Sequence, residues 1–232
     1  MMMKIKNVIW SVLFTSAFCV AQNPVIKLAN LEQTARVQND LKYSVDGIEG
    51  HQYFLDEWGT GKIIINDSII NTQARIQFDM VSGEPIIGNE YKEGKGFILR
   101  DKSVTGFVIN NTNFVRISSE KFLDKTKQKF FVVPVFTNEN YFIIKYSKTL
   151  KEPYIANNGY NEADLNKKYV TQKKYYILNK EGKYIEVRLK EKKILKALKT
   201  NNKELKKYIK SNNLNLKESS DLITFLNYYH SL

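Results

Sequence analysis

The chain has 232 residues, of which 43% are hydrophobic and 26% charged, and its net charge at pH 7 is +12. This composition is that of a globular protein with a core of its own, and it excludes an intrinsically disordered chain. One cysteine and two histidines are present, which excludes a fold stapled by disulfides and most sites built on several thiolates or imidazoles.

Residues 1–21 have the layout of a secretory signal peptide. Lys4 and Lys6 provide a positive start, a mostly apolar run follows, and small residues occupy the last positions, Cys19 and Ala21. We therefore predict export, with cleavage after Ala21, to the periplasm, the outer membrane or the exterior of a bacterial cell. An alternative is that Cys19 accepts a lipid, although the bulky residue before it disfavours lipidation.

The next segment, residues 22–50, shows no clean hydrophobic period. We expect it to form an irregular lead-in, with one short helix over 31–41 as an alternative. The pattern then becomes that of β-structure over residues 51–190. The clearest case is 74–78, where apolar residues alternate with polar ones, so that one face of a strand is buried and the other is wet.

Turns rich in Asn, Asp and Gly separate the strand patterns, and strands joined by such short turns pair antiparallel. We expect strands at 62–65, 69–70, 74–78, 97–100, 104–109, 114–117, 130–136, 141–146, 169–178 and 184–189. Pro134 cannot donate to a ladder, so the strand that contains it is expected at an edge or to carry a bulge.

Residues 191–232 change to the helical period. The clearest stripe is Leu222, Phe225, Leu226 and Tyr229, which we expect to pack on the β-domain, with a helix cap at Ser220 and Asp221. The predicted fold class is thus mainly β (α+β). It is an antiparallel β-meander, curled or barrel-like, with two or three C-terminal helices covering an edge or an end.

Positive charge is concentrated in the last third of the chain. Residues 167–217 hold 17 basic and 4 acidic residues, whereas residues 22–120 hold 10 basic and 13 acidic ones. Lysines interleave with tyrosines on one predicted strand and recur every three or four residues in the predicted helices, a pattern that suits anionic ligands. The candidate surface consists of Lys167, Lys168, Lys173, Lys174, Lys196, Lys203, Lys206 and Lys210.

The alternative is that these lysines form the solvated face of amphipathic helices. If the basic surface binds a ligand, we expect anionic envelope lipid, anionic polysaccharide or another envelope protein as its partner. Export argues against nucleic acid, although nucleic acid would otherwise be the leading polyanion for so basic a segment.

Motifs of known enzyme classes are absent, and we expect no cofactor. His51 lies five residues before Asp56 and could form a metal site with it, but a polar lead-in to the first strand explains it as well, so we expect no metal. Carboxylate catalysis remains open because its two acids can be distant in sequence. The acidic candidates are Glu57, Asp79, Glu84 and Glu90.

Ser68 follows an aspartate in a predicted turn and precedes an isoleucine. The tripeptide 67–69 resembles a short acceptor for bacterial O-glycosylation, although Asp-Ser is also ordinary turn chemistry.

The order of elements resembles a family of uncharacterised exported proteins of Gram-negative bacteria. The segments that carry the resemblance are 54–58 before 61–65, 141–146, 175–178 before 182–183, 221–223 and 228–229. The resemblance covers most of the exported chain and implies a β-rich fold. The family has no assigned activity, so the resemblance gives no residue a role.

These observations predict an exported envelope protein that is a non-enzymatic binding or structural module with a basic C-terminal third. The alternative is a carboxylate-dependent enzyme acting on an envelope or extracellular glycan. Two acidic side chains facing each other across a cleft would favour the enzyme, and a lysine-lined surface would favour binding.

Overall fold

The computed structural model describes residues 37–38, 41–88, 95–135, 139–153, 166–200 and 203–232. The predicted signal peptide, Glu90 and most of the segment predicted as an irregular lead-in or short helix lie outside the described residues.

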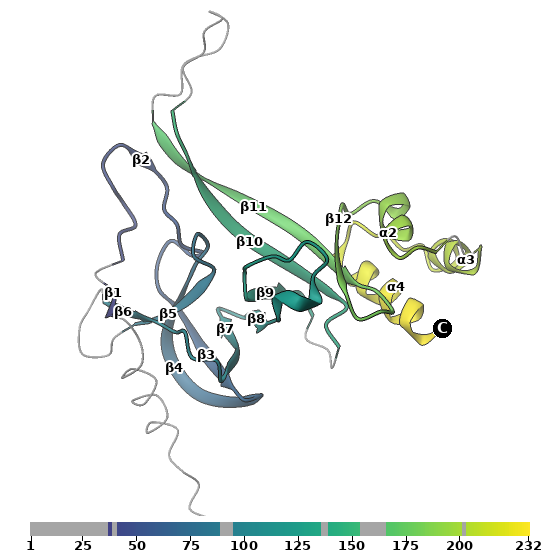
Figure 1. Cartoon of the computed structure of the whole chain (residues 1–232), viewed down its shortest axis with the longest axis horizontal. Coiled ribbons are helices and arrows are strands. Elements are labelled where there is room, and N and C mark those ends of the chain that lie inside the picture. The colour runs from purple at the N-terminus through teal and green to yellow at the C-terminus, as the bar shows by residue number, and fades with distance from the viewer. Residues whose placement is uncertain (1–36, 39–40, 89–94, 136–138, 154–165, 201–202) are drawn as a thin grey trace, which may run out of the picture.

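Twelve strands form one sheet in the described part of the chain, and all but one of the strand pairings are antiparallel (Figure 1). The strand order is β1-β6-β5-β4-β3-β7-β8-β9-β10-β11-β12, and β2 pairs parallel with β11 off this path. The strands are β1 (Val37–Gln38), β2 (Ile48–Glu49), β3 (Gly59–Ile65), β4 (Ser68–Asp79), β5 (Glu84–Gly88), β6 (Gly96–Ile98), β7 (Val104–Ile109), β8 (Thr112–Arg116), β9 (Phe130–Val133), β10 (Phe142–Lys151), β11 (Lys167–Leu178) and β12 (Tyr184–Val187).

The sheet curls because its two meanders meet at β3. Strands β3 to β6 form one meander and β7 to β12 the other, and β7 pairs with the free edge of β3. The connection 99–103 must therefore lead from β6 past β5, β4 and β3 to β7. These are four inter-strand spacings of about 4.8 Å, or about 19 Å in a flat sheet, which is close to the reach of a fully extended segment of that length. The predicted curled antiparallel meander is confirmed, and the sheet is open rather than closed into a barrel.

Two features of the local sequence fix the hairpins of this region. The turns before β4 and β8 have positive φ at both central residues, 47° and 60° at Asn66 and Asp67 and 42° and 67° at Asn110 and Asn111, as type I′ turns require. In β3, a Cβ on Gly61 would lie 1.8 Å from the backbone oxygen of Val108, so only glycine permits the close approach of β3 and β7 there.

The strand predicted across Pro134 is shorter in the structure. It ends at Val133, directly before the proline, and it lies between β8 and β10 rather than at an edge. The prediction of an edge strand or a bulge is therefore wrong. A strand that pairs with a neighbour on each side needs its backbone N–H groups for hydrogen bonds. Pro134 has no N–H, and β9 ends at the residue before it.

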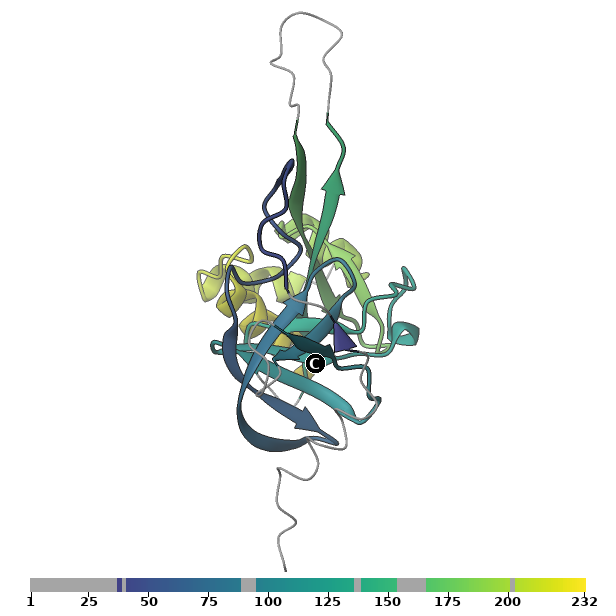
Figure 2. The ribbon, with the colours of Figure 1, turned by 90° about the vertical axis from the view of Figure 1, so that its left-hand side faces the viewer.

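Strands β10 and β11 form a long hairpin that projects from the body of the molecule as an arm (Figures 1 and 2). Ten residue pairs join them, from Phe142 opposite Ile177 to Lys151 opposite Lys168. The arm is braced at β2, which pairs with Lys167 and Lys168 of β11.

Three helices follow the sheet and gather beside β12, at one end of the molecule (Figure 1). They are α2 (Glu191–Ala197), α3 (Lys203–Ser211) and α4 (Ser219–Ser231), and a short 3-10 helix, η1 (Ser119–Lys121), precedes β9. Helix α4 begins at Ser219, and its N-cap residue, Glu218, makes no side-chain hydrogen bond to the helix. The predicted cap at Ser220 and Asp221 is therefore wrong. The carboxylate of Asp221 instead accepts the backbone N–H of Asn215 at 2.8 Å.

The stripe on α4 packs as predicted. Leu222, Phe225 and Leu226 are completely buried and Tyr229 is 6% exposed, and all four belong to the large core between the sheet and the helices. A second, smaller core lies on the other side of the sheet and contains Ile117, Phe122, Phe131, Val133, Ile143, Tyr176 and Tyr184. Both faces of the central strands are thus buried, which explains the continuous apolar run of β9.

His230 fastens the end of α4 to the sheet and makes the stability of the fold depend on pH. Its ring stacks on Tyr141 at 3.9 Å between centroids, and its Nε2 lies 3.0 Å from the backbone oxygen of Leu178. Burial lowers the pKa of His230, an effect that the Leu178 carbonyl and Glu139 partly offset and Lys180 reinforces.

Because the pKa of His230 is lower in the folded than in the unfolded chain, its contribution to stability is present above about pH 6.5 and is lost as the pH falls through the lowered pKa. We expect urea unfolding to show a decrease in the free energy of unfolding over this window. The variant His230→Gln should flatten the decrease. An equal pH dependence in the variant and the wild-type chain would contradict this role of His230.

Candidate functional site

A cavity of about 560 Å³ lies against α2 and the start of α3. Four of the residues that line it are lysines, and one is acidic. The lining residues are Glu191, Lys192, Leu195, Lys196, Lys199, Thr200 and Lys206. We call it the lysine cavity.

The helical period of α2 brings two of these lysines to one face. Ile194 and Leu195 are buried in the large core, which fixes the orientation of the helix. Lys192 and Lys196 are spaced i and i+4, so they lie along one side of α2, and Lys199 follows the end of the helix; all three are exposed. Packing of the apolar face therefore determines where the charges point.

Lys199 has a backbone conformation that is unfavourable for lysine. Its φ is +52°, and it follows Leu198 at the C-terminus of α2. The N–H of Thr200 donates to the oxygen of Leu195 at 3.2 Å, which is the hydrogen bond of a Schellman motif. Glycine is the usual residue at this position because a Cβ is disfavoured in the left-handed region. The chain thus has a strained lysine at the edge of the lysine cavity.

On α3, Leu205 and Ile209 are buried and the lysines lie away from them. Lys203, Lys206 and Lys210 are exposed and share one side of the helix, and of these Lys206 lines the cavity. The prediction that the four helical candidates face solvent is confirmed. The structure adds Lys192 and Lys199 to the candidate site, and their spacing from Lys196 is the sequence signal that could have identified them.

The four strand candidates do not form one surface with each other. Side chains alternate along β11, so Lys167 and Lys173 lie on one face and Lys168 and Lys174 on the other. Lys167 pairs with Glu152 at 2.9 Å and Lys174 with Glu186 at 2.8 Å. The Nζ of Lys173 lies 5.0 Å from the centre of the Tyr146 ring, and Lys168 also has a partner.

The acidic candidates are scattered. Asp79 is buried and accepts the N–H groups of Val81 and Ser82, at 2.8 Å and 3.1 Å, so it caps the turn after β4. Glu84 pairs with Arg100 at 2.8 Å, and the side chain of Glu57 is exposed. Three cavities in the described part of the chain have one acidic residue each in their lining, Glu139, Glu191 and Glu186.

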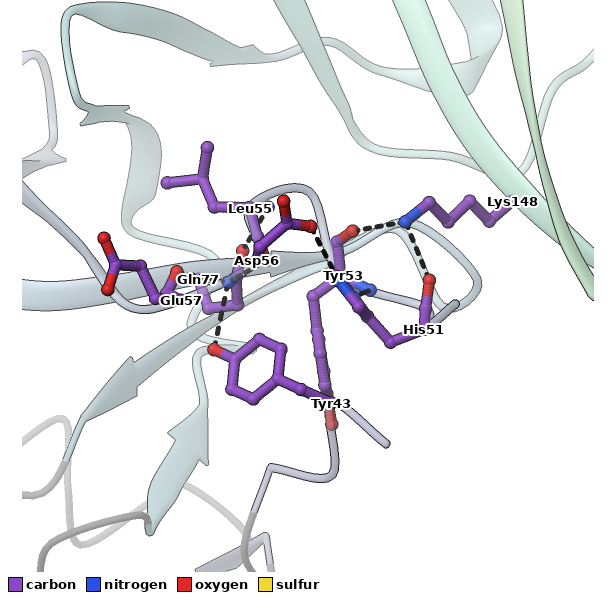
Figure 3. A network of polar contacts seen from close by, with 8 residues as sticks. All are labelled: Tyr43, His51, Tyr53, Leu55, Asp56, Glu57, Gln77 and Lys148. Carbon is purple, nitrogen blue, oxygen red and sulfur yellow. Dashed lines mark hydrogen bonds and ion pairs between the residues drawn. The ribbon is translucent and has the colours of Figure 1, made fainter. Parts of the chain in front are cut away.

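The structure does bring His51 and Asp56 together, with 2.9 Å between Nε2 and Oδ1 (Figure 3). The other ring nitrogen, Nδ1, accepts the N–H of Tyr53 at 3.2 Å. With the proton on Nε2, that nitrogen donates to Asp56 and the lone pair of Nδ1 accepts from Tyr53, so both ring nitrogens are engaged within the chain. No group of three or more possible metal-binding side chains occurs among the described residues.

The surrounding contacts show that this network holds the chain between β2 and β3 in place (Figure 3). The fully buried amide of Gln77 accepts from the N–H of Leu55 at 3.1 Å and donates to two backbone oxygens at 2.9 Å. Lys148 reaches from the arm and donates to the backbone oxygens of His51 and Tyr53, at 2.7 Å and 2.8 Å. Burial lowers the pKa of Lys148 and raises that of Tyr53 to about 12. The network braces the outer half of the arm against the chain between β2 and β3.

Ser68 lies directly after the type I′ turn of β3 and β4, and its side chain is exposed. Its position at a hairpin tip is accessible, as a glycosylation acceptor requires.

No protein-family model matches the chain, and no curated protein or solved structure is significantly similar to it. None of the helices in the described residues has the length and apolar character needed to cross a membrane. The candidate site therefore depends on its own geometry, and among these three cavities of the described residues the lysine cavity gathers the most charge of one sign.

Proposed function

We propose that this protein is an exported, non-enzymatic envelope protein that binds the anionic groups of lipid or polysaccharide in the lysine cavity. The observation that carries the proposal is the convergence of four lysines on one cavity that contains a single carboxylate. The ammonium group of lysine is a compact point charge and a common ligand for phosphate and carboxylate.

The shape of the cavity strengthens this attraction. Lysine side chains place long methylene stems along a surface and keep the charge at its rim, and here the buried Leu195 contributes an apolar wall. Like charges around low-dielectric walls focus the field, which raises the local concentration of anions. A ligand that enters displaces counter-ions and relieves repulsion among the lysines.

Lys199 provides independent support. A lysine with φ of +52° costs roughly 1 kcal/mol relative to glycine, and strained residues of this kind gather at functional sites. Lys199 therefore adds its charge to the cavity at a cost in stability that glycine would avoid.

The test is the variant Lys199→Gly. We expect it to raise the free energy of unfolding by about 0.5–1 kcal/mol, since the strain is removed, and to weaken binding to vesicles of phosphatidylglycerol and to an acidic polysaccharide. Chemical denaturation and vesicle co-sedimentation measure the two effects. Comparing the vesicles with the polysaccharide identifies the source of the anion.

The chain contains a matched control. Lys125 also has a positive φ, 48°, and its side chain is exposed, but it lies between η1 and β9 and does not line the cavity. Lys125→Gly should therefore stabilise the fold by a similar amount and leave anion binding unchanged. If the two variants reduce binding equally, or neither does, the lysine cavity is not the binding site.

A further inference from the structure

The edge of β11 that faces away from β10 is paired at both of its ends and open between them. Strand β2 pairs with Lys167 and Lys168 at the outer end of the arm, and β12 pairs with residues 175–178 at the inner end (Figure 1). Within the described residues, no strand pairs with this side of β11 over the six residues 169–174. We call these residues the open edge of β11.

The open edge presents main-chain groups that no strand satisfies. The N–H of Leu178 donates to the oxygen of Tyr141 at 2.9 Å, so the even-numbered residues of β11 bond to the β10 side. Main-chain groups alternate in direction along a strand, so the N–H and C=O groups of Thr171 and Lys173 point to the open edge. The side chains of Thr171, Gln172 and Lys173 are exposed, and solvent therefore reaches this part of the strand.

The other edge of the arm is closed at the same level. Lys148 lies opposite Thr171 in the hairpin, and its N–H donates to the backbone oxygen of Met80 at 3.0 Å. The body of the protein thus covers β10 where β11 is open. A strand with one open edge is the structure to which an extended peptide adds by β-augmentation, since main-chain hydrogen bonds then supply the affinity.

The charges around the open edge favour an acidic peptide. Residues 169–174 contain no aspartate or glutamate. Lys174 is already paired with Glu186 at 2.8 Å, but Lys173 is exposed and has its Nζ 5.0 Å from the centre of the Tyr146 ring. Arg188, directly after β12, is exposed as well. Lysine on an edge strand opposes pairing with another basic strand and favours an acidic one.

A second copy of the chain does not fit the open edge. Antiparallel pairing of two open edges about their common centre would place the part of β11 that pairs with β2 against the part that pairs with β12. Both parts are already occupied on this side, so β2 or β12 would have to leave. The open edge accepts only a strand that is short or that turns away at both ends.

We propose that the open edge of β11 binds an extended acidic peptide of another protein, which adds to the sheet as a further strand. The main-chain groups of Thr171 and Lys173 bond to the peptide backbone, and an acidic side chain of the peptide pairs with the Lys173 ammonium group. The open edge is about 20 Å long at about 3.3 Å per residue, which suits a segment of about six residues. This surface shares no residue with the lysine cavity and does not depend on its proposed function.

The probe is a six-residue peptide of alternating glutamate and valine, blocked at both ends, and the measurement is amide hydrogen exchange by NMR. In the free protein we expect slow exchange at Gln172 and Lys174, which bond to β10, and fast exchange at Thr171 and Lys173. The peptide should slow exchange at Thr171 and Lys173 by at least about tenfold. A peptide held in the lysine cavity would leave these two amides unchanged, so the two proposals fail separately.

Two variants test the hydrogen bonds and the charge. Thr171→Pro removes an N–H that faces the open edge and no bond to β10, so it should abolish protection of Lys173 by the peptide while the arm stays folded. Thr171→Val keeps the N–H and is its matched control. Lys173→Glu should weaken binding of the acidic peptide by about tenfold, whereas Lys151→Glu, an equal change of charge on β10, should not.

A probe with the same side chains separates strand pairing from charge attraction alone. The glutamate–valine peptide methylated on every backbone nitrogen keeps its carboxylates but donates no main-chain hydrogen bond, and it should protect Thr171 and Lys173 far less. Slow exchange at these two amides in the free protein, no change when the acidic peptide is added, equal protection by the methylated peptide, or full protection of Lys173 in Thr171→Pro would each overturn the proposal.

Discussion

Reversing Lys196, Lys203, Lys206 and Lys210 to glutamate is expected to abolish binding of the protein to anionic vesicles and acidic polysaccharide while the fold remains intact. All four side chains are exposed, and the apolar residues that hold α2 and α3 are untouched. The change replaces attraction by repulsion at the lysine cavity and along one side of α3. Circular dichroism checks the fold, and vesicle co-sedimentation checks binding.

Salt dependence and a control of equal charge complete this test. Wild-type binding should fall steeply with salt, because the screening length shortens from about 10 Å at 0.1 M to about 3 Å at 1 M. Reversal of Lys62, Lys102, Lys125 and Lys127, which are exposed but lie outside the last third of the chain, changes the net charge equally and should preserve most of the binding. If the wild-type protein does not bind anionic vesicles or acidic polysaccharide at low salt, the lysines of residues 167–217 form only a solvated surface.

Truncation of one residue of α4 is expected to have the largest effect on stability. Leu226 is completely buried in the large core, where α4 packs beside β10. We expect Leu226→Ala to lower the free energy of unfolding by about 2–4 kcal/mol, since the substitution removes apolar contacts and leaves a cavity. Urea denaturation measures the loss of unfolding free energy as a lower midpoint, and we expect the slope of free energy against urea concentration to stay unchanged.

Its neighbour on the helix provides the control. Asn227 is exposed, so Asn227→Ala should change stability by less than about 0.5 kcal/mol. A denaturation midpoint that is the same for Leu226→Ala and the wild-type chain would mean that α4 is a free tail, and the packing described here would be refuted.

Local patterns in the sequence were sufficient to predict most of the strands and helices. The Asn-Asp and Asn-Asn turns require positive φ at two successive residues, and the hairpins of β3 with β4 and β7 with β8 form around them. The apolar stripe of α4 has the helical period and is buried as expected. These features depend on residues close together in the sequence, so each can be predicted from its own segment.

Other features depend on segments that are distant in the chain. The pairing of β3 with β7, which curls the sheet, requires a close approach of Gly61 to Val108 that no local pattern encodes. Pro134 alone predicts an edge strand or a bulge, but the place of β9 between β8 and β10 was decided by the apolar faces on both sides of it.

For the candidate site, the sequence by itself determined that the last third of the chain is basic and that lysines recur along its helices, because charge and period are properties of the residues in order. Only the tertiary structure decided which lysines act together. Packing of Ile194, Leu195, Leu205 and Ile209 orients α2 and α3 so that lysines from both helices line one cavity, while alternation along β11 splits the strand lysines between two faces. The physical reason is that burial of apolar side chains determines the orientation of each element, and the charged side chains point wherever that orientation leaves them.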